Sequence, residues 1–225
     1  VKVWRERTVK MSGRIFKVWR ERTIQAHTGI VYAVAVLPGG ARFVSVSEDG
    51  TAKLWTLDGA LERTFTVGSR VLRVAALPDG VHFVVGVGYD EDNEEDSFEV
   101  RLYRVDGTLA HAFKGHTYNV WSVAATHDGR HIISGSFDHL VKVWSVATKS
   151  LVSTCEGHSE CVQAVAVMPD GQRFLSGADD YTIRVWLLDG TLENTFLKLH
   201  TDAVMSLVAL PDNQHALSGS WDNTV

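Results

Sequence analysis

The sequence predicts an all-β protein assembled from repeated short strands. A tight turn recurs along the 225 residues, with successive turns 40, 49, 42 and 42 residues apart. Apolar runs of strand length, rich in β-branched and aromatic residues, flank each turn. No helical spacing of apolar residues extends over a convincing length. The turns combine proline or histidine with residues that accept positive φ, and they are Pro38-Gly39-Gly40, Pro78-Asp79-Gly80, His127-Asp128-Gly129, Pro169-Asp170-Gly171 and Pro211-Asp212-Asn213.

Each repeat is expected to contain four strands. The first strand leads into the turn, at residues 31–37, 71–77, 120–125, 162–168 and 204–210. The second strand follows the turn, as at residues 42–47 and 131–136. The third strand ends in an aromatic residue, at residues 52–55, 100–103, 141–144 and 183–186. A further turn precedes the fourth strand, at residues 60–65, 108–113, 150–155 and 191–196. Short runs separated by turns predict antiparallel pairing throughout.

A polar set recurs at fixed spacing in these repeats. A His is followed by a Ser 18 residues later, an Asp 22 residues later and a Trp 28 residues later. Ser, His and Asp also make up a hydrolytic triad, but an enzyme needs one active site rather than several equivalent ones. The repetition therefore predicts a structural role. The members are His27, Ser45, Asp49 and Trp55; His116, Ser134, Asp138 and Trp144; His158, Ser176, Asp180 and Trp186; and His200, Ser218 and Asp222.

Four antiparallel strands in about 42 residues are typical of a β-propeller blade, and blades stack around an axis because one blade cannot bury both faces. The repeat resembles the WD-repeat family through its Gly-His pairs at 115–116 and 157–158 and its third strands at 141–144 and 183–186. No Trp-Asp dipeptide follows these third strands, which departs from the family pattern. The resemblance implies that each polar set forms a hydrogen-bond chain from Trp through Ser and His to Asp.

This resemblance divides the chain into a basic N-terminal extension, residues 1–14, and a WD-repeat propeller, residues 15–225. Four complete blades are expected at about residues 27–66, 67–114, 115–156 and 157–197, with a composite fifth blade from residues 198–225 and 15–26. Residues 16–19 would supply the third strand of the composite blade, and Trp19 would complete the set of His200. Trp4 competes for this place, because residues 2–8 and 17–23 have the same sequence. A five-blade ring and an open arc from a larger propeller remain alternatives.

The second repeat departs from the others. Val67, Val85 and Tyr103 stand where His, Ser and Trp are expected, so this blade should be held by packing alone. It also carries an insertion with seven acidic residues between positions 90 and 99. Dense like charges are typical of a hydrated loop. A basic partner and a calcium ion are the alternatives for this loop, although it lacks the EF-hand pattern.

The family geometry implies a docking surface on the top face, built by the loops that join the fourth strand to the first and the second strand to the third. Aromatic residues, Met and Arg are enriched at protein-binding surfaces. The alternative is that several of these side chains pack the channel wall. The candidate partner-binding residues are Tyr32, Leu72, Trp121, Phe137, Met205, Trp221 and Arg70.

The predicted function is a non-catalytic scaffold that binds a protein or peptide on this face, without a cofactor or metal. One alternative is a truncated propeller fragment that must associate to cover its edges, so self-association is expected if the ring is open. Another is a channel-site hydrolase or carbohydrate binder, for which Asp179 and Glu48 are the only candidate carboxylates.

The composition limits the partners and the compartment. The formal net charge of −5 argues against a nucleic-acid-binding face, although residues 1–22 carry eight Lys and Arg. No apolar run is long enough for a membrane span, so no membrane partner is expected. Two cysteines are too few for a disulfide framework. We therefore expect a reducing compartment, the cytoplasm, with the nucleus as an alternative.

Overall fold

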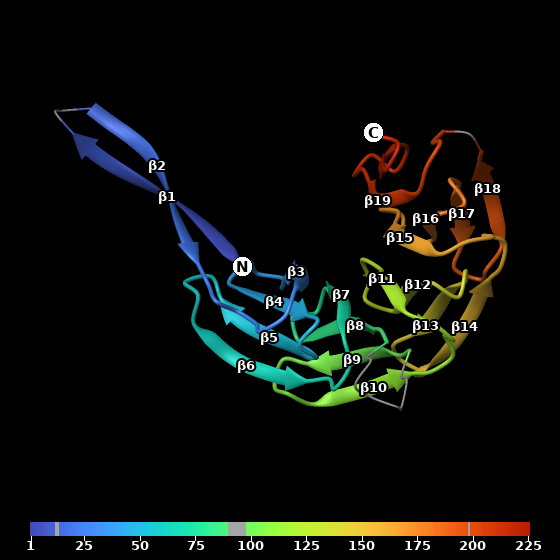
Figure 1. The fold of residues 1–225 in the computed structure, drawn as a ribbon, viewed down its shortest axis with the longest axis horizontal. Coiled ribbons are helices and arrows are strands. Elements are labelled where there is room, and N and C mark those ends of the chain that lie inside the picture. The colour runs from blue at the N-terminus through green and yellow to red at the C-terminus, as the bar shows by residue number, and fades with distance from the viewer. Residues whose placement is uncertain (12–13, 90–97, 198) are drawn as a thin grey trace.

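The computed structural model describes residues 1–11, 14–89, 98–197 and 199–225, and for residues 4–22 it describes the backbone without the side chains. These residues form strands β1 to β20 and no helix. Sixteen of the strands form four antiparallel sheets of four strands each (Figure 1). The predicted all-β class and the four-stranded blades are confirmed.

Within each blade the strands pair in chain order. Blade 1 contains β3 (Val31–Val36), β4 (Arg42–Ser47), β5 (Thr51–Thr56) and β6 (Leu61–Thr66). Blade 2 contains β7 (Val71–Ala76), β8 (His82–Val87), β9 (Val100–Arg104) and β10 (Leu109–Phe113). Blade 3 contains β11 (Val120–Ala125), β12 (His131–Ser136), β13 (Val141–Ser145) and β14 (Ser150–Cys155). Blade 4 contains β15 (Val162–Val167), β16 (Arg173–Ala178), β17 (Ile183–Leu187) and β18 (Leu192–Phe196).

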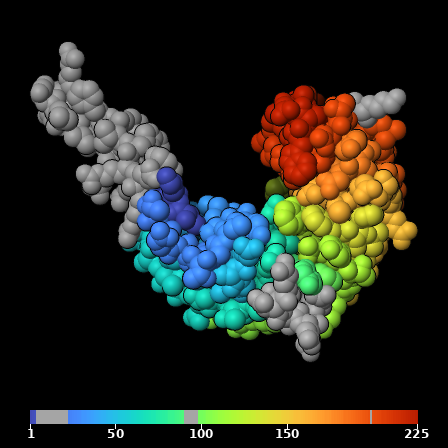
Figure 2. All heavy atoms as spheres, in the orientation of Figure 1, coloured from blue at the N-terminus to red at the C-terminus, as the bar shows by residue number. Residues whose placement is uncertain are grey.

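Two further sheets have two strands each. The last sheet pairs β19 (Val204–Ala209) with β20 (Ala216–Ser220). The N-terminal hairpin pairs β1 (Lys2–Met11) with β2 (Arg14–Thr23). The first strands of successive sheets, β3, β7, β11, β15 and β19, contact one another in that order. The sheets therefore follow an arc, with the first and last sheets standing apart at its two ends (Figures 1 and 2).

The turn between the first and second strands shows why each repeat carries an Asp-Gly or a similar pair. In blade 4 the backbone N–H of Gly171 donates to the carbonyl of Met168 at 2.9 Å. Gly171 has a φ of +68°, a left-handed conformation that a side chain disfavours. The Asp170 carboxylate accepts the next two backbone N–H groups, from Gln172 and Arg173. The turn thus satisfies its own polar groups before the second strand begins.

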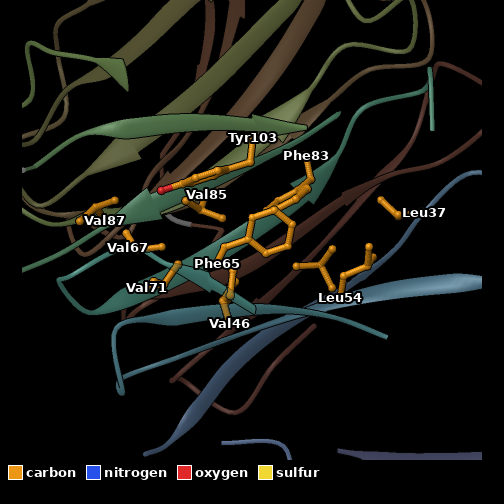
Figure 3. Close-up of a cluster of buried hydrophobic side chains, with 12 residues drawn as sticks. Leu37, Val46, Leu54, Phe65, Val67, Val71, Phe83, Val85, Val87 and Tyr103 are labelled. Carbon is orange, nitrogen blue, oxygen red and sulfur yellow. The ribbon is translucent and has the colours of Figure 1, made fainter. Parts of the chain in front are cut away.

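The core lies between blades rather than within one blade. One buried cluster joins blades 1 and 2, a second joins blades 2 and 3, and a third joins blades 3 and 4. In the first of these, the Phe65 and Phe83 rings meet edge to face with centroids 4.9 Å apart (Figure 3). Each sheet consequently depends on its neighbours to cover its two faces.

Blade 2 replaces the polar set with packing, as its sequence indicates. Val67 is 6% exposed and Val85 is 0% exposed, and both belong to the cluster between blades 1 and 2. Tyr103 stands in the Trp position, with its ring stacked on Phe83 at 5.7 Å and edge-on to Phe65 at 5.6 Å. The buried Val67, Val85 and Tyr103 thus stand in the positions that His, Ser and Trp of the polar set have in the other blades.

The two termini do not form the composite blade in this structure. Residues 14–23 pair with residues 2–11 instead, so that Trp19 lies opposite Glu6 in the register. The last sheet accordingly contains β19 and β20 alone among the described residues. The physical reason is loop closure, because a hairpin joins neighbouring segments through a short connection, whereas pairing with β20 closes a loop of nearly the whole chain.

The second strands of blades 2, 3 and 4 each carry a glycine that faces the next first strand, whereas blade 1 has Val46 at this position. A Cβ added at Gly135 would come within 2.6 Å of Val162 and 3.2 Å of Val165, both on the next blade. At Gly177 the same addition would come within 2.6 Å of Val204. At Gly219, in the last sheet, it would meet only the hydroxyl of Ser206.

We predict that Gly135→Ala lowers the free energy of unfolding by about 1–3 kcal/mol, because the added methyl group forces two packed blades apart. Gly219→Ala is the matched control, since the equivalent position there meets only the mobile end of a serine. Urea denaturation of both variants measures the difference. Equal midpoints for the two variants would contradict the proposed role of the glycine in blade contact.

Candidate functional site

Three polar sets form complete hydrogen-bond chains. In blade 3, His116 Nδ1 lies 2.8 Å from Asp138 Oδ2, and His116 Nε2 lies 2.7 Å from Ser134 Oγ. The indole N–H of Trp144 donates to Ser134 Oγ at 2.8 Å. Blades 1 and 4 repeat these contacts, with the Trp–Ser bond at 2.9 Å and 2.7 Å. The residues of these two chains are His27, Ser45, Asp49, Trp55 and His158, Ser176, Asp180, Trp186.

The fourth set is present without a Trp. His200 lies 2.9 Å from Asp222 and 2.7 Å from Ser218, as in the other sets. Among the described side chains, no indole N–H donates to Ser218 Oγ. The backbone of Trp19 lies in the N-terminal hairpin, and its side chain lies outside the described part of the structure. Ser218 therefore has one hydrogen-bonding partner fewer than its three equivalents.

The connectivity of these sets equals that of a hydrolytic triad, but the three complete sets have no free nucleophile. A serine hydroxyl donates one hydrogen bond, here to the His Nε2, and its oxygen accepts the Trp N–H. Ser45, Ser134 and Ser176 are each 0% exposed, so a substrate has no access to their oxygens. Burial and the Trp contact thus make each set an architectural tie between a blade and the segment that precedes it.

The aspartates of these sets are held in their ionised form. Burial alone would raise the pKa of Asp49, but hydrogen bonds from Thr51, Thr28 and His27 outweigh it and hold the pKa at about 2. Burial is likewise outweighed at Asp138, where the bond from His116 contributes most to a lowered pKa. Burial also lowers the pKa of His27, despite the opposing effect of Asp49. The neutral imidazole then donates from Nδ1 to the carboxylate and accepts from serine at Nε2.

A second site lies on what we call the rim, formed where the segment before each first strand meets the turn after the second strand. One backbone hydrogen bond joins these segments in each of the four blades and in the last sheet, from the N–H of the turn to the carbonyl of the preceding segment. The five bonds measure 2.9 to 3.1 Å and run from Glu48 to Ile30, Gly88 to Arg70, Phe137 to Asn119, Asp179 to Cys161 and Trp221 to Ala203. The rim is therefore a repeated backbone frame that carries different side chains in each blade.

A register shift recurs at the same rim position in all five first strands. The pairing with the second strand skips one residue after the first valine of each strand. Such a bulge leaves one residue out of the ladder and re-aims its side chain. The bulged residues are Tyr32, Leu72, Trp121, Gln163 and Met205.

Five aromatic rings form a continuous series on the rim, which we call the aromatic ladder. Tyr32 meets Trp121 edge-on with centroids 6.1 Å apart, and Trp121 stacks on Phe137 at 5.1 Å. Phe137 stacks on Tyr118 at 6.3 Å, and Tyr118 stacks on Phe98 at 5.5 Å. The ladder joins side chains from blades 1, 2 and 3. Tyr118 is 51% exposed, so the ladder offers aromatic surface to solvent.

Arg73 adds a positive charge to the ladder. Its guanidinium lies 4.7 Å from the centroid of the Trp121 ring and donates to the carbonyl of Leu72 at 2.8 Å. Burial lowers the pKa of Arg73, while Tyr32 acts in the opposite direction. No carboxylate among the described residues forms an ion pair with Arg73. The indole Nε1 of Trp121 is also buried, and none of the described residues forms a hydrogen bond with it.

The other predicted rim residues differ in what they expose. Trp221 is 65% exposed and Met205 is half-buried, so both present surface. Arg70 lies 3.6 Å from Glu48, and the pair neutralises its own charge. Leu72 is only 3% exposed and its side chain lies beside Gly88, so it presents almost no surface to a partner. The choice of Leu72 from its repeat position is therefore wrong for a contact residue.

Sequence reasoning missed three residues of this site. Tyr118 and Phe98 extend the aromatic ladder, and Arg73 lies over its centre. Tyr118 lies three residues before Trp121, a predicted contact residue, so its aromatic character was an available signal. No feature of the sequence pointed to Arg73, because its contact with the Trp121 ring joins blade 2 to blade 3.

The alternative sites receive little geometric support. Asp179 accepts hydrogen bonds from Gln163 at 2.9 and 3.0 Å, and Glu48 pairs with Arg70, so each carboxylate has a partner of its own.

The described residues contain no group of three His, Cys, Asp or Glu side chains that could hold a metal ion. Most of the acidic insertion, residues 90–97, lies outside the described residues. In the part of the chain that the structure describes, no helix is long and apolar enough to cross a membrane.

Comparison with known families gives a match to the WD domain, G-beta repeat, at residues 19–56, 107–145, 149–186 and 190–225. These ranges cover more than half of the chain. The protein belongs to the WD-repeat family. The unmatched residues between 56 and 107 contain β7, β8 and β9 of blade 2, the WD-repeat blade that lacks the polar set.

Several curated WD-repeat proteins are similar to this chain. It is 30% identical over 156 residues to the small ribosomal subunit protein RACK1y of Oryza sativa subsp. japonica, covering 65% of this chain and 41% of that protein. It is 28% identical over 127 residues to RACK1 of Caenorhabditis elegans, covering 55% and 39%. It is 31% identical over 120 residues to WD repeat-containing protein 1 of Gallus gallus, covering 51% and 19%. The chain thus spans under half the length of each of these relatives.

We predict that Ser134→Ala lowers the free energy of unfolding by about 1–3 kcal/mol, because it leaves the Trp144 N–H and the His116 Nε2 buried without partners. Ser218→Ala should lower it less, because that serine has no indole to satisfy. Urea midpoints of the two variants provide the comparison. A larger loss for Ser218→Ala would show that the indole bond contributes nothing.

We predict that stability falls as the pH decreases. A His27 pKa below its ordinary value of 6.5 means that the unfolded chain takes up this proton first, so stability is complete above about pH 6.5 and declines below it. The lowered Asp49 pKa of about 2 has the same sign, and its contribution is lost as the pH falls from about 4 toward 2. Urea midpoints should therefore decrease from about pH 7 to pH 5 and again to pH 3. A midpoint that rises toward acid would refute this assignment.

Proposed function

We propose that this WD-repeat chain is a non-catalytic scaffold that binds a protein or peptide on its rim. The aromatic ladder is the observation that carries the proposal. Stacked rings that remain partly exposed provide rigid apolar area, and aromatic and Arg residues dominate the energy of protein interfaces. The contact surface comprises Tyr32, Trp121, Phe137, Met205, Trp221 and Arg70, with Arg73 and Tyr118 added.

The charge at the ladder favours a partner with an acidic group beside an apolar one. Arg73 has no ion-pair partner among the described carboxylates, and its guanidinium is half-buried against the Trp121 ring. A carboxylate from a partner would stabilise the charge of the Arg73 guanidinium, which burial partly removes from water. The two groups would form a charge-assisted hydrogen bond. An apolar neighbour of that carboxylate would cover the aromatic rings.

The relatives support a role in assembly rather than in chemistry. Their names describe a small ribosomal subunit protein, a ribosome biogenesis protein and a subunit of a translation initiation factor. Each of these names describes a component of a larger particle or pathway, and this agrees with a surface that binds a protein. We infer a cytoplasmic location for this chain on the same basis, supported by Cys155 and Cys161, which are both free thiols.

A second candidate is a propeller fragment that associates through its uncovered edges. The specific observation is the two-stranded last sheet, which has half the strands of the four blades before it. Association and rim binding use different surfaces, so one does not exclude the other.

We predict that peptides selected on the immobilised chain from a random library carry an acidic residue next to an apolar residue. Trp221→Ala should weaken the affinity for peptides that contact Trp221 by about thirtyfold, which corresponds to about 2 kcal/mol of binding free energy. Arg73→Gln should have the same effect on peptides that contact Arg73. Fluorescence anisotropy with labelled peptides measures these affinities.

Leu151→Ala is the control, because Leu151 is 47% exposed and pairs with Trp144 at the end of blade 3 that is remote from the rim. It should leave peptide affinity unchanged. Melting temperatures separate binding from packing, and that of Trp221→Ala should equal the wild-type value because Trp221 is 65% exposed. Unchanged peptide affinity in both rim variants would refute the rim as the binding site.

A further inference from the structure

The aromatic ladder separates two kinds of unsatisfied polar group on the rim. On one side lie donors, since the Arg73 guanidinium pairs with no described carboxylate and the buried Trp121 Nε1 has no described acceptor. On the other side, in blade 4, lie acceptors. Buried polar groups in proteins are nearly always paired, so unpaired groups on a binding surface point to the chemistry of its ligand.

Gln163 and Asp179 provide the acceptors of blade 4. Gln163 is 7% exposed and occupies the bulged position of β15, which is the place of Trp121 in blade 3. Its Nε2 donates to both carboxylate oxygens of Asp179, at 2.9 and 3.0 Å. Its Oε1 is buried, and none of the described residues donates a hydrogen bond to it. Because Nε2 and Oε1 belong to one amide, the unpaired oxygen lies close to the carboxylate, and we call these two groups the acceptor pair.

The acceptor pair carries a negative charge that no described cation balances. Among the described side chains, only the neutral Gln163 bonds to the Asp179 carboxylate, and each carboxylate oxygen can accept a further hydrogen bond. Asp179 is half-buried, so it still reaches solvent. The rim segments of blade 4 and the last sheet contain five Asp and Glu, two of them in polar sets, and no Lys or Arg; they are residues 158–163, 178–182, 200–205 and 220–224.

The neighbouring Cys161 responds to this negative charge. Burial raises the pKa of its thiol above the ordinary value, and the charges of Asp179 and Glu160 raise it further. The same charges that disfavour a thiolate at this place favour a cation. A positively charged group from a partner is therefore what this part of the rim lacks.

The acceptor pair lies next to the aromatic ladder along the rim. The Asp179 N–H donates to the Cys161 carbonyl at 2.9 Å, and the Cys161 thiol donates to the Phe137 carbonyl at 3.7 Å. Phe137 stacks on Trp121 at 5.1 Å, and the guanidinium of Arg73 lies 4.7 Å from the Trp121 ring. The rim thus presents a cation, two stacked rings and an anion in that order.

We propose that the acceptor pair is a subsite for an arginine side chain of the peptide that binds the rim. The peptide then carries an acidic residue at Arg73, an apolar residue on the rings and an arginine at Asp179, whichever way its chain runs. The guanidinium donates to the Asp179 carboxylate, and the partial negative charge of the nearby Gln163 Oε1 stabilises it without direct contact. This inference rests on the proposed function, because it describes a further contact of the same peptide.

Arginine fits this subsite better than lysine does. Two parallel N–H groups of a guanidinium can bond both oxygens of one carboxylate. A guanidinium is more weakly hydrated than an ammonium group, so it loses less on leaving water for a half-buried site. It also stacks on aromatic rings, and the half-buried Phe137 lies on the adjoining blade.

Selection from one random peptide library on three immobilised chains tests this proposal. Peptides enriched on the wild-type chain should contain an arginine near the acidic–apolar pair. On Asp179→Asn, which removes the charge and keeps an oxygen for Gln163, the acidic–apolar pair should persist and the arginine enrichment should disappear. Glu160→Gln is the matched control, because Glu160 is an exposed acid of the same rim segment, and it should keep the arginine.

Changes in the peptide test the same contact without altering the protein. Fluorescence anisotropy compares a selected peptide with its citrulline and lysine forms. Citrulline has the shape of arginine without its charge, so it should weaken affinity for the wild-type chain about tenfold and leave affinity for Asp179→Asn unchanged. Lysine should weaken affinity less than citrulline, because it keeps the charge. The wild-type comparison decides the question if Asp179→Asn does not fold.

The outcomes separate this proposal from the proposed function. A wild-type chain that enriches the acidic–apolar pair without arginine would overturn the subsite and leave the rim as the binding site. A chain that enriches no such pair would overturn both. Arginine that stays enriched on Asp179→Asn, or citrulline that binds the wild-type chain as tightly as arginine, would also overturn the subsite. Equal affinity for lysine and arginine would overturn the choice of arginine.

Discussion

Each sheet of this protein can bury its two faces only against the sheets beside it. The buried clusters lie between blades 1 and 2, 2 and 3, and 3 and 4, and none is confined to one blade. The glycines of the second strands follow from this constraint, because Gly135 and Gly177 let the next first strand approach to contact distance. In the last sheet Leu217 is 48% exposed, and no further sheet among the described residues covers it.

The polar sets act within this packing rather than in place of it. Each connects a blade to the segment before it through a chain in which every donor has an acceptor, and such a network stabilises only when complete. Blade 2 shows that the network is replaceable, since Val67, Val85 and Tyr103 occupy the positions of His, Ser and Trp and are all buried in one apolar cluster. The same Ser–His–Asp connectivity serves catalysis elsewhere, and here burial and the Trp contact assign the three complete sets to architecture.

The rim combines a repeated backbone with side chains that do not repeat. The same hydrogen bond and the same bulge recur in all five sheets, so the frame is independent of the residues it carries. Blades 1 to 3 use this frame for an aromatic ladder, and the last sheet uses it for the exposed Trp221. A common frame with variable side chains is suited to binding, because binding surfaces can diverge while the blade contacts persist.

The sequence by itself determined the strands, the blades and the polar sets, because these depend on residues that are close in the chain or that repeat at constant spacing. It also placed Tyr32, Trp121 and Phe137 on one face. The tertiary structure decided which of those residues are accessible, since Leu72 shares the repeat position of Trp121 yet is covered by its own neighbours. It also decided the ladder and the contact of Arg73 with Trp121, because these join different blades. The tertiary structure also decided the pairing of the N-terminal segments, which could pair with each other or with the last sheet across the arc. They pair with each other, because a short local loop costs less entropy to close.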